Sequence, residues 1–143
     1  MAISHILVPY DGSEPSRKAF QFGLDIAKKY VASITAVTCV LEDNFEPEVM
    51  SPEPSQYQKT QNATAASLIS LVEFEAKEAG VKFNGVVLKT PSIVDGLLSY
   101  AENNRIDLIA MGSRGLGGFK KLMLGSVASG VSQYSKCPVL IIK

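Results

Sequence analysis

Strand-like and helix-like segments alternate along the whole chain of 143 residues, and this alternation limits the possible folds more than any other feature. Short apolar runs, as in residues 3–9 and 33–40, are typical of buried strands. The segments between them repeat apolar residues every three or four positions, the spacing of a helix with one buried face. The alternation predicts an α/β fold with a mainly parallel sheet. Because no linker or low-complexity tract divides the chain, we expect a single domain over residues 1–143.

Capping and turn residues indicate where the elements begin and end. Strands are expected at 3–9, 33–40, 81–88, 106–111 and 138–142, and helices at 13–30, 56–79, 92–103 and from 126 onward. Ser13 and Ser92 are expected to cap the first and third helices, and Gly80 to end the second. The first helix is expected to turn five residues inward: Ala19, Gly23, Ile26, Ala27 and Tyr30. Residues 42–54 carry five acidic side chains and three prolines, which predicts a loop.

The charge balance limits the choice of partner. Fourteen basic and fourteen acidic residues give a formal net charge of zero, which argues against a broad binding surface for nucleic acid or anionic membrane. No apolar run approaches the roughly 18–20 residues that span a bilayer. The first residues lead directly into a strand, without the pattern of a signal peptide. A cytoplasmic protein is the simplest expectation.

Cysteine and histidine are too scarce to predict a metal site. The two cysteines, Cys39 and Cys137, lie far apart in apolar runs, so we expect buried, reduced thiols. The single histidine, His5, lies early in the first strand and is expected to have a structural role.

The segment Gly112-Ser113-Arg114-Gly115 follows the fourth strand, and nine residues later Gly125-Ser126 opens the last helix. Glycine lets the backbone approach a ligand closely, and the N–H groups of a helix N-terminus favour an anion such as phosphate. The pattern is not a Walker A loop, and Lys120 replaces the third glycine of the dinucleotide motif G-x-G-x-x-G. It therefore predicts a nucleotide site of another type, unless the glycines serve only to turn the chain.

The turn after the first strand and the turn after the fourth are expected to face one crevice. In an open parallel sheet, ligands bind beyond the carboxyl ends of the strands, where the direction of winding reverses. If the first and fourth strands are neighbours at that point, Asp11-Gly12-Ser13 lies opposite the glycine motif.

Several polar side chains near this crevice have more than one interpretation. Asp11 is either a turn residue that caps the first helix, an acceptor for an adenine amino group or a ribose hydroxyl, or an outer ligand of Mg²⁺. Arg114, Lys120 and Lys121 either neutralise phosphates or remain solvated. Ser126 caps the last helix, donates to a phosphate, or does both.

The spacing Gly112-x2-Gly115-x9-Gly125-Ser126 resembles the G-2x-G-9x-G-(S/T) motif of the ATP-binding branch of the universal stress protein family. Residues 6–13 and 137–142 are similar to that family's first and last strands, so the resemblance covers the chain apart from 42–54. It implies a Rossmann-like open sheet of five parallel strands in the order 3-2-1-4-5, with helices on both faces. It also implies ATP between the first and fourth strands, with Mg²⁺ held mainly by phosphates and water.

The resemblance further implies roles for individual residues. Asp11 and the backbone of Val40 would face the adenine. Pro9, Met111 and Gly112 would lie near the adenosine. Backbone N–H groups and one serine hydroxyl would hold the phosphates, from Gly115, Gly125, Ser126 and Val127. Arg114 lies between the first two glycines, where the family accepts different polar residues.

An ATP-binding regulatory module of the stress response is the function that the resemblance implies, with an unidentified protein partner. A slow ATPase or phosphoryl-transferring enzyme is the alternative, and it would need a base near the γ-phosphate and a well-fixed metal. Because the glycine motif contains no acidic residue or histidine, we expect binding rather than turnover. A structural protein with a vestigial site is a third alternative.

Family members are commonly homodimers, and the apolar strand at 138–142 is expected at a sheet edge, where it would pair with a second copy.

Overall fold

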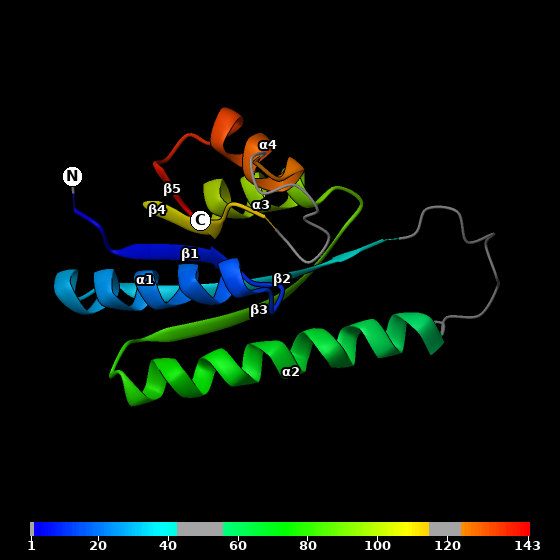
Figure 1. Ribbon diagram of the computed structural model, residues 1–143, viewed down its shortest axis with the longest axis horizontal. Helices are drawn as coiled ribbons and strands as arrows, with labels where there is room; N and C mark the ends of the chain where they lie inside the picture. The colour runs from blue at the N-terminus through cyan, green and yellow to red at the C-terminus, as the bar shows by residue number, and fades with distance from the viewer. Residues whose placement is uncertain (1, 43–55, 115–123) are drawn as a thin grey trace.

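The computed structural model describes residues 2–42, 56–114 and 124–143 (Figure 1). Five parallel strands form one sheet in the order β3-β2-β1-β4-β5. The strands are β1 (His5–Pro9), β2 (Ser33–Leu41), β3 (Phe83–Thr90), β4 (Leu108–Gly112) and β5 (Val139–Ile142). The predicted fold class and strand order are therefore confirmed.

Four helices connect the strands and cover both faces of the sheet (Figure 1). The helices are α1 (Glu14–Tyr30), α2 (Gln56–Glu78), α3 (Ile93–Asn103) and α4 (Ser126–Tyr134). One apolar cluster lies between the sheet and the helices α1 and α2, and a second lies between the sheet and the helices α3 and α4. Among the described helices, none combines the length and the apolar character needed to cross a membrane.

Three helix ends lie at the residues that the sequence predicts. The side-chain oxygen of Ser13 accepts a hydrogen bond from the N–H of Ser16, and that of Ser92 accepts one from the N–H of Asp95. Gly80, just after α2, has a φ of 69°, the left-handed conformation that ends many helices. The predicted caps at Ser13 and Ser92 and the predicted stop at Gly80 are confirmed.

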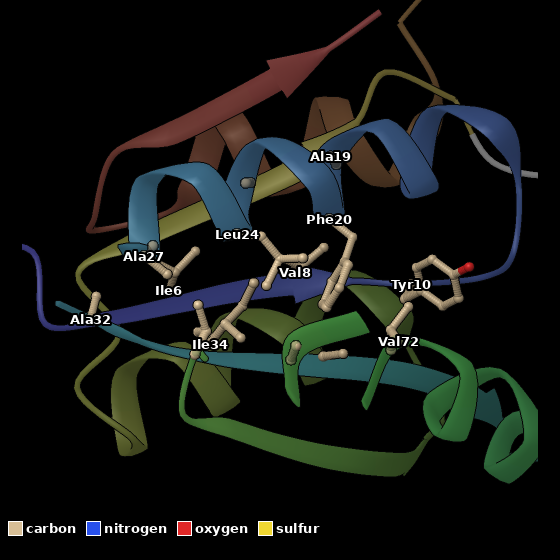
Figure 2. Close-up of a cluster of buried hydrophobic side chains, with 14 of the residues drawn as sticks. Ile6, Val8, Tyr10, Ala19, Phe20, Leu24, Ala27, Ala32, Ile34 and Val72 are labelled. Carbon is tan, nitrogen blue, oxygen red and sulfur yellow. The ribbon is translucent and has the colours of Figure 1, made fainter. Parts of the chain in front are cut away.

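Three aromatic rings meet in the core between α1, α2 and the sheet, and Figure 2 shows Tyr10 and Phe20 among them. The ring of Phe20 is fully buried and lies edge-on to Tyr10, with 6.2 Å between the ring centres, and edge-on to Phe83, at 6.4 Å. Tyr10 belongs to the turn that follows β1, so this packing ties α1 to the end of the strand. The expected burial of Tyr30 is wrong, because α1 ends at that residue and its side chain extends into solvent.

The two edges of the sheet are β3 and β5. Residues 139–141 of β5 are half-buried, and Ile142 is buried against the α1 side of the sheet. The expected edge position of the segment 138–142 is confirmed (Figure 1).

Candidate functional site

A cleft of about 360 Å³ opens where β1 and β4 end. This volume is within the usual range for small-molecule sites. The strands β1 and β4 are neighbours, and the chain winds away from β1 toward β2 and β3 on one side and toward β4 and β5 on the other. The cleft therefore lies at the reversal point of the sheet, where open α/β folds bind ligands. It is lined by Pro9, Tyr10, Asp11, Ser16, Val37, Cys39, Ile93, Leu97, Met111, Gly112, Arg114, Gly125, Ser126, Val127 and Ala128.

Most of the site residues named from the sequence line this cleft. They are Pro9, Asp11, Met111, Gly112, Arg114, Gly125, Ser126 and Val127. Val40 is not among the lining residues, although Cys39 is. Successive side chains of a strand point to opposite faces, so the buried side chain of Val40 points away from the cleft, and the contact of its backbone with adenine stays a prediction. Gly115, Lys120 and Lys121 lie outside the described residues.

The turn between β1 and α1 is anchored to the neighbouring strand. The N–H of Tyr10 donates to the carbonyl of Val37 at 2.8 Å, and the Thr38 hydroxyl donates to the carbonyl of Tyr10 at 2.8 Å. Oδ1 of Asp11 accepts the N–H of Ser13 at 2.9 Å. Asp11 is thus a turn residue, and the alternative that it caps the first helix is wrong, because Ser13 occupies the cap position as expected.

Two backbone hydrogen bonds of Ser113 hold the residue after β4 in place, one to the beginning of α4 and one to the end of β5. The carbonyl of Ser113 accepts the N–H of Gly125 at 2.7 Å, and the N–H of Ser113 donates to the carbonyl of Ile142 at 2.7 Å. A Cβ on Gly125 would lie 3.1 Å from the carbonyl oxygen of Ser113 and 3.3 Å from the Cα of Arg114. Since the φ of Gly125 is an ordinary −61°, it is the close packing of the two segments, not the backbone conformation, that favours glycine here.

Gly125, not Ser126, is the N-cap of α4, and within the described residues no side chain makes a capping hydrogen bond there. The expected cap at Ser126 is therefore wrong by one position, because Gly125 keeps the extended conformation and Ser126 already belongs to the helix. The first N–H groups of a helix have no partner within it. Ser126, Val127 and Ala128, the first residues of α4, line the cleft, so their N–H groups can donate hydrogen bonds to a ligand there.

Gly112 is required by packing, whatever its part in the approach of a ligand. A Cβ at this position would lie 2.7 Å from the Cβ of Pro15 and 2.8 Å from its backbone carbonyl carbon. The first turn of α1 therefore crosses directly over the end of β4. This contact brings the N-terminal ends of α1 and α4 to the same cleft.

The cleft has an apolar part and a charged part. The side chains of Val37, Cys39 and Leu97 line it from β2 and α3, while Arg114 is the only described positive side chain in its lining. No group of three or more His, Cys, Asp and Glu side chains in the described part of the chain is arranged to hold a metal ion. The donor set is suited to a ligand with an apolar or aromatic body and an anionic end.

Sequence reasoning missed the lining residues on β2 and α3. Val37 and Cys39 follow from the strand alternation once β2 is known to lie beside β1. Ile93 and Leu97 gave no such signal, because an apolar residue of a helix that faces a cleft has the same spacing as one that faces the core. Leu97 is fully buried; it belongs to the core between the sheet and the helices α3 and α4 and also lines the cleft.

Cys39 and Cys137 are free thiols, as expected, but both are half-buried rather than buried. Burial nevertheless raises the pKa of the Cys39 thiol to about 11. The thiolate is the reactive form, so at pH values below 11 we expect alkylation of Cys39 to be slow and to accelerate about tenfold per pH unit. Peptide mass spectrometry of a Cys137→Ser variant, labelled between pH 7 and 10, measures this dependence. A rate that levels off near pH 8 would contradict it.

The sequence profile of the universal stress protein family matches residues 2–143. This chain belongs to the universal stress protein family. A universal stress protein of Methanocaldococcus jannaschii is 31% identical over 142 residues, which cover 96% of this chain and 81% of the relative. The universal stress protein YxiE of Bacillus subtilis is 30% identical over 145 residues, which cover 96% and 97%.

Solved structures of family members have the same fold. The universal stress protein UspA of Lactobacillus plantarum superposes with a TM-score of 0.84 at 22% identity, over 100% of this chain and 99% of that one. A universal stress protein in complex with cAMP superposes with a TM-score of 0.74 at 25% identity, over 99% and 98%. A family member from Archaeoglobus fulgidus in complex with dAMP superposes with a TM-score of 0.75 at 17% identity, over the full length of both chains.

Proposed function

We propose that this protein binds ATP in the cleft between β1 and β4 and acts as a nucleotide-dependent regulatory module of the stress response. The observation that carries the proposal is that the N-terminus of α4, which no described side chain caps, meets Arg114 at one end of an apolar cleft. Such an end suits phosphate, and the apolar part suits a nucleobase. The complex of a 25% identical family member with cAMP supports an adenine nucleotide as the ligand.

In this proposal different residues of the cleft bind the adenine and the phosphates. The adenine lies against the apolar part, with Asp11 as a hydrogen-bond acceptor for its amino group. The phosphates accept hydrogen bonds from the N–H groups of Ser126 and Val127 and from the Ser126 hydroxyl, and the glycine motif assigns Gly115 to them as well. Mg²⁺, when bound, is held mainly by phosphate oxygens and water.

Binding is proposed in preference to turnover. Asp11 is the only carboxylate among the described lining residues, and it follows β1, whereas the helix N-terminus proposed for the phosphates follows β4. A general base near the γ-phosphate is a usual part of phosphoryl transfer. We therefore expect ATP to remain intact over the time of a binding experiment.

A calorimetric titration tests the proposal. We expect one ATP per chain, with weaker binding of GTP because guanine has no amino group at the position where adenine has one. ATP is also expected to slow the alkylation of Cys39, whose side chain lines the same cleft. Failure to bind ATP, with and without Mg²⁺, would overturn the proposal.

We also propose that two copies of the chain pair through β5. An edge strand with half-buried apolar residues can bind the same strand of a second copy across a twofold axis. Analytical ultracentrifugation is expected to show a species of twice 15.3 kDa. Lysine blocks edge pairing, so an Ile141→Lys variant is expected to sediment as a monomer. A wild-type monomer at micromolar concentration would contradict the proposal.

A further inference from the structure

We infer that Arg114 makes the cleft selective for nucleoside polyphosphates over nucleoside monophosphates. The inference rests on the proposed ATP site and adds to it the residue that distinguishes ATP from a monophosphate. The cAMP and dAMP complexes of family members hold ligands with a single phosphate, whereas the ligand proposed for this chain has three.

Arg114 lies beside the N-terminus of α4. Its neighbour Ser113 accepts the N–H of Gly125 through its carbonyl, and a Cβ on Gly125 would lie 3.3 Å from the Cα of Arg114. The side chain of Arg114 is half-buried and lines the cleft. A guanidinium and the first N–H groups of a helix therefore border the same end of the cleft.

The charge of Arg114 is not neutralised by the rest of the described chain. It forms no ion pair with another described residue, since the ion pairs there join other side chains. Asp11, the carboxylate that lines the cleft, follows β1 and accepts the N–H of Ser13. A guanidinium without a carboxylate partner at the wall of a cleft is suited to bind an anion from solution.

The N-terminus of α4 and Arg114 differ in which phosphates of a nucleotide they can bind. The unpartnered N–H groups belong to the first turn of α4, and the attraction of a helix dipole falls off within that turn. One phosphate fills such a site. Each further phosphate adds negative charge beyond the reach of these N–H groups. A guanidinium can donate two parallel hydrogen bonds to the oxygens of such a phosphate. Arg114 therefore favours the second and third phosphates over the first.

Affinities for ATP, ADP and AMP, measured by calorimetry without Mg²⁺, test the inference. We expect the wild type to bind ATP most tightly and AMP least. Arg114→Gln is expected to weaken ATP binding about tenfold to a hundredfold, the usual range for a lost charged hydrogen bond, and AMP binding less than about threefold. Arg114→Lys keeps the positive charge but cannot donate two parallel hydrogen bonds, so its affinity for ATP is expected to lie between those of the wild type and Arg114→Gln.

Arg105→Gln is the matched control. Arg105 is exposed and precedes β4, whereas Arg114 follows it, so a strand of about 15 Å separates the two positions. The control variant is expected to bind all three nucleotides like the wild type. The same ATP-to-AMP preference in Arg114→Gln as in the wild type, or an equal loss for both nucleotides, would overturn the inference. Absence of binding by the wild type would instead overturn the proposed function.

A second measurement needs no variant. Added salt screens the attraction between an arginine and a multiply charged ligand, so the wild-type affinity for ATP is expected to fall more steeply with ionic strength than the affinity for AMP. Parallel salt dependences for the two nucleotides would overturn the inference, even if the variants at position 114 fail to fold.

Discussion

Gly125→Val is expected to weaken ATP binding by at least about 100-fold while the protein remains folded. A Cβ alone would lie 3.1 Å from the carbonyl oxygen of Ser113, and valine adds two methyl groups to it. The beginning of α4 and the end of β4 must then move apart, which breaks the hydrogen bond from Gly125 to Ser113 and displaces the N–H groups proposed for the phosphates. Calorimetric titration with ATP, together with circular dichroism, measures both parts of this result.

Gly130→Ala provides the control on the same helix. A Cβ on Gly130 would lie 2.9 Å from a methyl group of Val94 on α3, so the substitution also crowds α4, but at a position that does not line the cleft. We expect this variant to lose thermal stability and to keep its ATP affinity within about threefold. Native-like affinity of the folded Gly125→Val variant would show that the beginning of α4 does not bind the phosphates.

Phe20→Ala is expected to lower the free energy of unfolding by about 3–5 kcal/mol, the usual cost of removing a buried aromatic ring. Phe20 is fully buried beside Tyr10 (Figure 2), and its ring lies edge-on to the rings of Tyr10 and Phe83, so the cavity opens between α1 and the sheet. Domains of this size are commonly stable by about 5–15 kcal/mol, so the loss is a large part of the total. Urea unfolding followed by circular dichroism measures it.

Phe22→Ala is the matched control, because it removes the same ring from the same helix. The side chain of Phe22 is 52% exposed, so the expected change in the free energy of unfolding is within about 0.5 kcal/mol. Equal losses in the two variants would contradict the packing described for α1.

The fold was predictable because local patterns carry most of the information that determines it. The alternation of strands and helices, the caps at Ser13 and Ser92 and the stop at Gly80 are all properties of short segments. The strand order came from the resemblance to the family, since it depends on contacts between distant segments. Tyr30 shows the limit of periodicity, which assigns a face to a residue but does not say whether the sheet extends far enough to cover it.

The site was predictable in its location and less so in its composition. The two glycines that line the described cleft are evident in the sequence, but the packing of Gly112 against Pro15, almost a hundred residues earlier, is not. Ile93 and Leu97 were missed since the sequence does not show which apolar side chains of α3 border a cleft. Both omissions concern contacts between distant segments, which local patterns do not contain.

The central claim is that this protein binds ATP without rapid turnover, and the nucleotide that it carries after purification tests the claim most directly. Protein purified without added nucleotide is denatured, and the released small molecules are identified and counted per chain by mass spectrometry. We predict ATP in near-stoichiometric amount. Mainly ADP would contradict binding without turnover and favour the slow ATPase, and the absence of any nucleotide, followed by no binding of added ATP, would contradict the site itself.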